Sequence, residues 1–332
     1  MRAVRLHRLE GPRALEIEDV PTPAPGPGEV LVRIRAAALN HRDLFITRGL
    51  YPKIVTPAQL GSDGAGVVEG IGDRVTSIRS GDEVVIDPML GWGDDERVRA
   101  ADSTILGMPS AGTFAQYVVV PAANVHPKPS ALSMEEAAAI PLCGLTAYRA
   151  VFTKGALRRG ETVLVPGVGG GVQSFVLLFA KAVGARAIVT SSSDEKLRRA
   201  RELGADVALN YASSGAWERE AKAAGPVDLV VDSSGGDTLA KAISALRPGG
   251  RVVVYGGTRP EAALKLFALF WNEISILGST MGSPSDFAAM LALFEDGRKP
   301  AVDGVFALDE VAIAMERMDG GAQFGKVVLR IE

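Results

Sequence analysis

Short apolar runs separated by glycine and aspartate turns characterise the first third of the chain. Residues 30–35 alternate in character, and residues 66–69 and 83–86 are apolar runs bounded by turn residues. Alternation with a period of two, punctuated by turn residues, predicts half-buried β-strands. We therefore expect a β-rich unit at the start of the chain.

From about Thr162 the pattern changes to strands that alternate with helices. The predicted strands are 163–165, 187–190, 227–232, 251–255 and 274–278, and the predicted helices are 172–183, 194–203 and 238–246. Strands alternating with helices of this length imply βαβ units and a parallel sheet. The chain then returns to a helix, 286–296, and a last strand, 326–331.

Length, charge and cysteine content narrow the class of protein. A chain of 332 residues favours two domains. The net charge of −3, without a lysine or arginine cluster, argues against nucleic-acid or anionic-membrane partners. No apolar run is long enough to span a bilayer, and the N-terminal segment lacks a signal-peptide core. The single cysteine, Cys143, fits a reducing compartment, so we expect a soluble, cytoplasmic protein.

A glycine-rich turn connects the predicted strand 163–165 to the helix that follows. In this context backbone N–H groups approach a pyrophosphate at the N-terminus of a helix. A tight turn without a ligand explains four glycines poorly, because each costs conformational entropy. Val172 or Gln173, depending on register, stands where a third small residue is usual. We predict that the dinucleotide is bound by Gly167, Gly169, Gly170, Gly171 and Val172.

The end of the second predicted strand indicates which dinucleotide binds. An NAD-binding protein is expected to place an acidic residue there, whereas this chain has three serines, 191–193. Hydroxyls and a lysine accept a 2′-phosphate that an acidic residue would repel. A helix N-cap by Ser193 explains only one of the serines. We therefore expect NADP(H), bound through Ser191, Ser192, Lys196 and Tyr211.

Six segments, taken in order, resemble the medium-chain dehydrogenases/reductases, especially the quinone-oxidoreductase-like and zinc-type alcohol-dehydrogenase-like branches. They are ALNHRDL (38–44), LGSDGAGVV (60–68), GTFAQYV (112–118), AAIPLCGLTAY (138–148), LGAD (203–206) and GKVVL (325–329). The resemblance covers essentially the whole chain. It implies an α/β protein in which a GroES-like β-barrel catalytic domain, residues 1–122 and 283–332, accompanies a Rossmann NADP-binding domain with a doubly wound parallel sheet, residues 123–282.

The resemblance also implies an active cleft between the two domains and further cofactor contacts. These contacts are Thr146, Ser233, Gly256, Gly257 and Lys326. For Lys326, an ordinary surface lysine is an equally good interpretation. Relatives of this type suggest a homodimer or homotetramer formed through the outer Rossmann strand near residues 274–277.

Zinc is not expected. A catalytic zinc needs three protein ligands and an open fourth position. In zinc-type relatives the ligands match Asn40, Ser62 and Cys143, and the first two offer only neutral oxygens, which bind zinc poorly. A rearranged site of Cys143, Asp63 and His41 is the remaining alternative.

Without a metal, hydrogen-bond donors must polarise the substrate oxygen while the nicotinamide delivers hydride. Asn40 is the first candidate donor, because it occupies the position of a ligand in zinc-type relatives. His41 is a candidate proton donor or a merely positional residue. Tyr51 is either an aromatic cover for the nicotinamide or substrate, as the matching aromatic residue of quinone-oxidoreductase relatives suggests, or a loop anchor.

The leading hypothesis is a zinc-independent, NADPH-dependent oxidoreductase that transfers hydride to a small quinone, enone, aldehyde or ketone. Two alternatives remain at this stage. One is a zinc-type alcohol dehydrogenase with non-standard ligands, and the other is a non-catalytic NADPH-binding protein. The sequence leaves the particular substrate open, because fold-level resemblance does not fix it.

Overall fold

The computed structural model describes residues 1–332 and divides into two compact units. Unit 1 comprises Met1–Cys143 and Gly282–Glu332, and unit 2 comprises Gly144–Met281. No helix in the chain is both long and apolar enough to cross a membrane.

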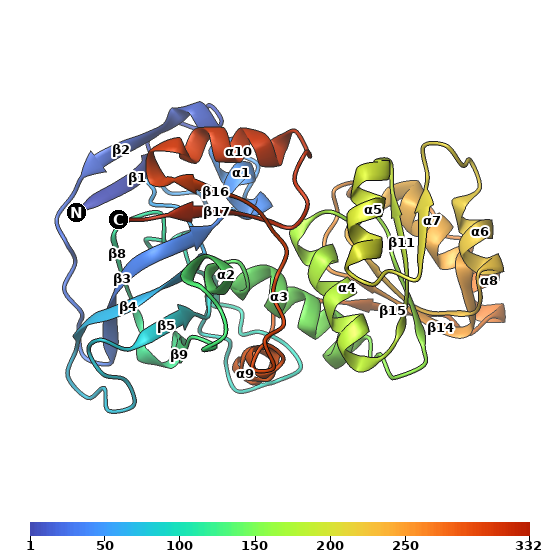
Figure 1. Ribbon diagram of the computed structural model, residues 1–332, viewed down its shortest axis with the longest axis horizontal. Helices are drawn as coiled ribbons and strands as arrows, with labels where there is room; N and C mark the ends of the chain where they lie inside the picture. The colour runs from blue at the N-terminus through green and yellow to red at the C-terminus, as the bar shows by residue number, and fades with distance from the viewer. The chain divides into compact units, whose positions relative to one another are not determined.

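Unit 1 is built on a seven-stranded sheet in which strands from both ends of the chain are neighbours (Figure 1). Its strands are β3 (Glu29–Ala38), β4 (Asp63–Ile71), β5 (Glu83–Ile86), β8 (Tyr117–Pro121), β9 (Val125–Pro127), β16 (Val302–Ala307) and β17 (Lys326–Arg330). The order is β16-β17-β3-β4-β5-β9, and β8 also pairs with β3. Val30, Val32 and Ile34 alternate into one core with Val327 and Leu329 of the last strand, so the alternation in the sequence is confirmed.

Smaller elements complete unit 1. They are β1 (Arg2–Leu6), β2 (Leu15–Asp19), β6 (Met89–Leu90), β7 (Thr104–Ile105), α1 (His41–Thr47), α2 (Met134–Ala138), α9 (Pro284–Ala292) and α10 (Val311–Asp319), and α3 (Pro141–Tyr148) begins in this unit. The division after Cys143 comes later than the boundary at residue 122 expected from the sequence. The reason is that β9 pairs with β5, and α2 packs against β3 and β4.

Unit 2 contains a six-stranded sheet in which every neighbouring pair is parallel (Figure 1). Its strands are β10 (Thr162–Val165), β11 (Arg186–Ser191), β12 (Val207–Asn210), β13 (Val227–Asp232), β14 (Leu246–Val254) and β15 (Ser275–Gly278). Its helices are α4 (Gly171–Val183), α5 (Asp194–Glu202), α6 (Trp217–Ala223), α7 (Gly236–Ala245) and α8 (Leu266–Trp271). The strand order is β12-β11-β10-β13-β14-β15. Successive strands are added on one side of β10 as far as β12 and then on its other side from β13, which is the Rossmann arrangement expected from the sequence.

The predicted and observed elements of unit 2 differ at β14 and at three elements that the sequence pattern did not predict. β14 begins at Leu246 rather than at Arg251, because the strand continues back through Pro248 and two glycines to pair Leu246 with Val227. No strand was predicted at β12, and no helix was predicted at α6 or at α8, whose apolar residues 266–271 are largely exposed.

Candidate active site

The glycine turn of unit 2 lies between β10 and α4, as the sequence predicted. Gly167 and Gly169 have φ angles of 72° and 123°, which side chains other than glycine rarely adopt. Gly170 is the N-cap of α4, and Gly171 and Val172 form its first turn. The turn is held to the next strand by bonds from Val168 N to Thr190 O, at 2.7 Å, and from Gly167 N to Thr190 Oγ1, at 3.2 Å. This arrangement leaves a helix N-terminus at the carboxyl end of the sheet, where an anion is stabilised.

The residues expected to bind a 2′-phosphate meet at the neighbouring strand ends. Ser191 pairs with Asn210 across β11 and β12, which places Tyr211 directly beyond the pair. Ser191 is buried, Ser192 is exposed, and Tyr211 is 44% exposed. The Lys196 side chain lies against the turn, because a Cβ added to Gly169 would fall 2.7 Å from Lys196 Cδ.

An open cavity adjoins this group. It has a volume of about 300 Å³, and its lining includes Gly167 of the turn, Tyr211 and Trp217. Two basic side chains, Lys241 and Arg259, and one acidic side chain, Asp237, also line it. The cavity therefore combines an aromatic wall with a net positive charge beside the glycine turn, a combination suited to a nucleotide.

The switch point between β10 and β13 is bridged by polar contacts. Gln173 Nε2 of α4 donates to Ser233 Oγ, which follows β13, at 3.2 Å. Gly256 packs closely on Ser233, since a Cβ added to Gly256 would lie 3.0 Å from the serine Cβ. Gly257 follows it, and Thr146 is a buried residue of α3 whose hydroxyl lies 3.9 Å from Met281 Sδ. Ser233 and both glycines therefore lie at the carboxyl ends of the strands, where doubly wound sheets bind ligands.

A buried polar cluster forms in unit 1 around Lys326, the first residue of β17. Its side chain is 2% exposed, and its Nζ donates to Leu39 O at 2.8 Å, Asn40 Oδ1 at 2.6 Å and Asp63 Oδ2 at 2.9 Å. Cys143 Sγ lies 3.5 Å from the same nitrogen. Lys326 is thus not a surface lysine, and its donors point into the protein.

Asn40 and Asp63 are fixed by this cluster. Asn40, which is 3% exposed, donates from Nδ2 to Asp63 Oδ2 at 3.0 Å and accepts at Oδ1 from Cys143 at 3.3 Å. Asp63 is fully buried, and its Oδ1 accepts from Leu142 N at 2.8 Å. The carboxylate, the amide and the ammonium therefore orient one another.

Arg42 brings a second buried positive charge to unit 1. Its Nη1 donates to Ser62 Oγ at 2.6 Å and to Leu106 O at 2.8 Å, and Ser62 Oγ donates in turn to the same carbonyl. Its guanidinium carbon lies 5.0 Å from the centre of the Tyr51 ring, a cation–π arrangement. Ser62 thus bonds Arg42 and a carbonyl, and Tyr51 is anchored by Arg42. Sequence reasoning missed Arg42, whose only signal is its place directly after His41.

Asp43 braces the start of α1. Its Oδ2 accepts from Asn40 N at 2.8 Å, which is the reciprocal bond of a helix-capping arrangement. Burial raises the pKa of Asp43 to about 6, while Arg42 and the bond from Asn40 act in the opposite direction. This agrees with a bracing role for Asp43 at the N-terminus of the helix.

The charges of the cluster follow from its contacts. Burial alone would lower the pKa of Lys326, but Asp63 and then Cys143 outweigh burial and raise it, so the ammonium is charged. Burial raises the pKa of the Cys143 thiol despite the nearby ammonium, which keeps the sulfur protonated at neutral pH. His41 is exposed in α1, and partial desolvation followed by the Lys326 charge lowers its pKa. It is therefore a neutral imidazole at pH 7.

One group of three potential metal-binding side chains comes together, and it lies outside this cluster. His7, Glu16 and Glu18 lie on the β1–β2 pair, with His7 and Glu16 exposed, and their ligand atoms are within 4.8 Å of one another. Cys143, Asp63 and His41 do not converge in this way.

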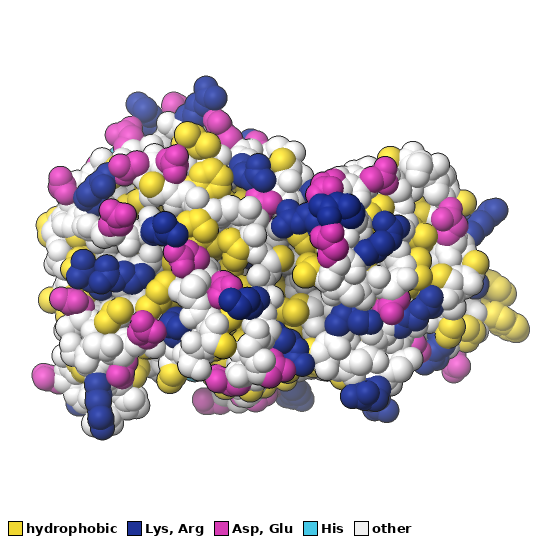
Figure 2. Space-filling view, in the orientation of Figure 1, with side chains coloured by type: hydrophobic (Ala, Val, Ile, Leu, Met, Phe, Trp, Pro, Cys, Tyr) yellow, Lys and Arg dark blue, Asp and Glu magenta, His cyan; other side chains and the backbone are white.

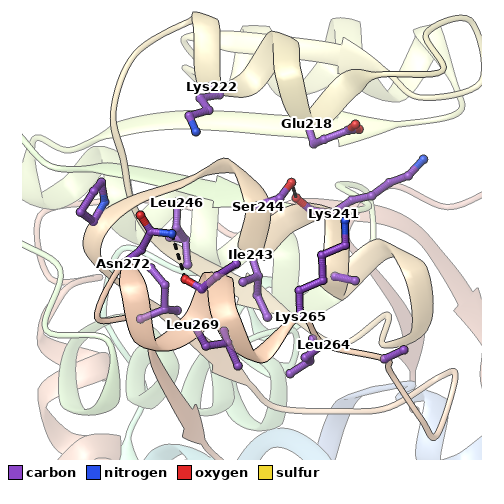
Figure 3. A pocket seen from close by; sticks show the side chains of 15 residues that line it. Glu218, Lys222, Lys241, Ile243, Ser244, Leu246, Leu264, Lys265, Leu269 and Asn272 are labelled. Carbon is purple, nitrogen blue, oxygen red and sulfur yellow. Dashed lines mark hydrogen bonds between the residues drawn. The ribbon is translucent and has the colours of Figure 1, made fainter.

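A cavity of about 470 Å³ lies in another part of unit 2 (Figure 3). Glu218 and Lys222 reach toward it from α6 and Lys241 from α7, and Ile243 and Leu269 contribute to an apolar lining. None of the site residues predicted from the sequence lines this cavity.

Comparison with known proteins identifies the class that this fold and these sites define. Residues 26–130 match the alcohol dehydrogenase GroES-like domain, and residues 171–296 match the zinc-binding dehydrogenase domain. The chain is 36% identical to the zinc-type alcohol dehydrogenase-like protein YogA of Leptosphaeria maculans, over 96% of this chain and 94% of that protein. It therefore belongs to the medium-chain dehydrogenase/reductase superfamily, as the sequence indicated.

Two solved structures of related enzymes are similar to this chain over nearly its whole length. The crystal structure of an NAD-dependent alcohol dehydrogenase is 41% identical, with a TM-score of 0.94 and complete coverage of both chains. A structure of the crotonyl-CoA carboxylase/reductase AntE in complex with NADP is 25% identical, with a TM-score of 0.89, and covers 99% of this chain and 94% of that one. The chain is accordingly an oxidoreductase related to both alcohol dehydrogenases and reductases.

Proposed function

We propose that this protein is a zinc-independent, NADP(H)-dependent oxidoreductase that transfers hydride to a quinone, an enone, or an aldehyde or ketone. One observation carries the zinc-independent part. Of the three side chains at the ligand positions of zinc-type relatives, Asn40 Oδ1 accepts from Lys326 and Ser62 Oγ is bonded to Arg42. The third, Cys143, donates from Sγ to Asn40 Oδ1 at 3.3 Å and lies 3.5 Å from the Lys326 ammonium. The donor set therefore does not fit a zinc ion.

The preference for NADP(H) is supported by the ends of β11 and β12. The strand end carries Ser191 and Ser192 in place of a carboxylate, and Lys196 and Tyr211 lie in the same region of unit 2. The nearest acidic residue in sequence, Asp194, already accepts from Asn210 Nδ2 at 2.7 Å. Hydroxyls with a lysine are typical partners of a phosphate group.

A selective loss of affinity tests this preference. Lys196→Ala should weaken NADPH binding by about tenfold, because it removes a charge-assisted bond to the 2′-phosphate, and should leave NADH binding nearly unchanged. Lys222→Ala, which removes a lysine of α6, is the matched control. Equal effects of Lys196→Ala on both nucleotides, or tighter NADH than NADPH binding by the unmodified protein, would refute the NADP(H) assignment.

When bound, the nicotinamide supplies the hydride chemistry, and the chain supplies orientation and polar stabilisation. Asn40 Nδ2 has two N–H groups, of which one donates to Asp63, and the other is our candidate donor to the substrate oxygen. His41 is neutral at pH 7 and can offer one ring N–H to the same oxygen or to water. Tyr51, stacked on Arg42, is the candidate aromatic cover.

A substrate panel combined with metal analysis tests the function. Purified protein should oxidise NADPH with at least one class among quinones, enones (including enoyl thioesters), aldehydes and ketones. It should contain far less than one zinc per chain and keep its activity in a chelator. About one zinc per chain would favour the alcohol dehydrogenase with unusual ligands. Tight NADPH binding without turnover of any class would favour the non-catalytic binding protein.

We also propose that unit 2 associates with a second copy of the chain through β15, in a homodimer or homotetramer. β15 is an edge strand of its sheet, and Ile276 is 45% exposed. Figure 2 shows hydrophobic side chains gathered at the end of unit 2 where α8 lies. Four apolar residues of α8 are exposed: Leu266 by 73%, Phe267 and Phe270 by 65%, and Trp271 by 70%. An exposed edge strand beside such a patch is typical of an interface.

The mass of the protein in solution tests this assembly. A multiple of 34.7 kDa corresponding to two or four chains is expected by light scattering. Ile276→Lys, which places a charge on the edge, should shift the mass toward one chain, whereas Ile313→Lys, on the exposed face of α10 in unit 1, should not. A monomer at micromolar concentration before any substitution would overturn the proposal.

A further inference from the structure

The Lys326 ammonium is enclosed by Leu39, Asn40 and Asp63, here called the cage, which provide a hydrogen-bond acceptor for each of its N–H groups. An ammonium has three N–H donors, and the three oxygens of Leu39, Asn40 and Asp63 accept one each. Their distances of 2.6–2.9 Å are those of hydrogen bonds to a charged nitrogen. Zinc–oxygen bonds are shorter, at about 2.0–2.2 Å. The distances from the three oxygens to the lysine nitrogen are therefore those of hydrogen bonds and not of bonds to zinc.

The surroundings of this ammonium include two of the three positions that bind zinc in related dehydrogenases. Asn40 and Cys143 both contact the lysine nitrogen, and the carboxylate of Asp63 completes the group. One carboxylate and one ammonium leave the cluster without net charge, which lowers the cost of its burial. A divalent cation added to this cluster would bring two further charges without additional anionic ligands.

We propose that Lys326 is the built-in cation of this site: its ammonium takes the place of a divalent metal, bars such a metal from binding, and orients the Asn40 amide. The orientation follows from the contacts. Lys326 and Cys143 both donate to Asn40 Oδ1, so the amide nitrogen must face Asp63. Lys326 is thus a positioning residue that acts through Asn40. The inference rests on the proposed zinc-independent function.

Metal binding by a pair of variants tests the exclusion of metals. Asn40→Cys restores a sulfur ligand near Asp63 and Cys143 but keeps Lys326, whereas N40C/K326M differs only in lacking the ammonium. With Co²⁺ as the probe, N40C/K326M should bind about tenfold or more tightly than N40C, because no fixed charge repels the ion. A thiolate-to-cobalt charge-transfer band should appear in the double variant and be lost when Cys143→Ser is added.

Equal Co²⁺ affinity in N40C and N40C/K326M, or no Co²⁺ binding by either, overturns the proposal that Lys326 prevents a divalent metal from binding. If N40C/K326M does not fold, N40C/K326Q replaces it, because the glutamine amide can still donate to Asp63 and to the Leu39 carbonyl. This comparison needs no catalytic activity. Failure of this proposal is therefore distinguishable from failure of the proposed function. The proposed function is tested separately, by elemental analysis of the unmodified protein and by the substrate panel.

Turnover tests the orientation of Asn40. Lys326→Met should lower kcat by about tenfold in a chain that keeps Asn40, because the amide is no longer held in place. In an Asn40→Ala background the same substitution should have almost no further effect. An equal loss of kcat in both backgrounds would show that Lys326 does not act through Asn40, and would overturn that part of the proposal.

Discussion

Breaking the buried ion pair between Asp63 and Lys326 should destabilise unit 1 far more than losing both charges together. The two groups are 2.9 Å apart, and their side chains are 0% and 2% exposed. Asp63→Asn leaves the ammonium without a counter-charge, and Lys326→Met does the same to the carboxylate. Each should lower the free energy of unfolding by about 3–5 kcal/mol. D63N/K326M removes both charges and should cost less than either single substitution.

Urea unfolding followed by tryptophan fluorescence measures this coupling. The chain has three tryptophans, and only Trp92 lies in unit 1, so W217F/W271F provides a background in which fluorescence reports that unit. The coupling energy between Asp63 and Lys326 should be at least about 2 kcal/mol.

The more exposed pair Lys299–Glu136, whose Nζ–Oε1 distance of 2.8 Å is similar, is the matched control. Its side chains are 60% and 21% exposed, and its coupling should not exceed about 0.5 kcal/mol. If the two pairs showed the same coupling, the ammonium of Lys326 would have to be hydrated, and the description of a buried cage would be wrong.

Three further predictions concern other parts of the chain. Burial raises the pKa of Asp87 from 3.8 to about 7, so the folded state retains a proton that the unfolded state has lost, and stability should fall as pH rises through this window. Between pH 5 and pH 8 this loss is at most about 3 kcal/mol, because about two pH units of the shift lie above pH 5. Asp87→Asn should remove much of it in urea unfolding compared at these two pH values, and an unchanged pH dependence would contradict the reasoning. Gly169→Ala should weaken NADPH binding in a titration by about tenfold or more, because the φ of 123° is strained for alanine and its Cβ meets Lys196; unchanged affinity would argue against this turn as the binding site. Ser133→Ala removes the bond from Glu136 N that caps α2 and should lower stability by about 1 kcal/mol, read as a lower urea midpoint for unit 1 than for Ser130→Ala.

The fold could be predicted largely from local pattern. Strand β13 has the predicted bounds, and β10 and α4 differ by one residue at an end, because a buried parallel strand followed by a glycine turn leaves few alternatives. Helix α8 was missed for the opposite reason. Its residues LFALFW form a short apolar run with no polar face, and periodicity does not separate such a helix from a buried strand.

The candidate site was predictable in part. The glycine turn and the serines of β11 are adjacent to regular elements in sequence, so their positions followed from the elements. The cage did not follow in this way. Lys326 is separated from Asn40 by 286 residues and from Asp63 by 263, and nothing in its local sequence distinguishes a buried lysine from an exposed one. Only the pairing of β17 with β3 brings its side chain to the amide.

The interruption of unit 1 by unit 2 sets an order for assembly on the ribosome. Unit 2 is a continuous stretch, Gly144–Met281, and can fold as soon as it has emerged, whereas β16 and β17 are synthesised after it. Until then residues 36–38 of β3 lack the strand that pairs with them, and Asp63 has no ammonium to neutralise it. Termination of translation just before Lys326 would therefore leave a chain in which the carboxylate of Asp63 has no counter-charge and β3 has no β17 to pair with. Such a chain would be a substrate for quality-control proteases rather than a slightly impaired enzyme.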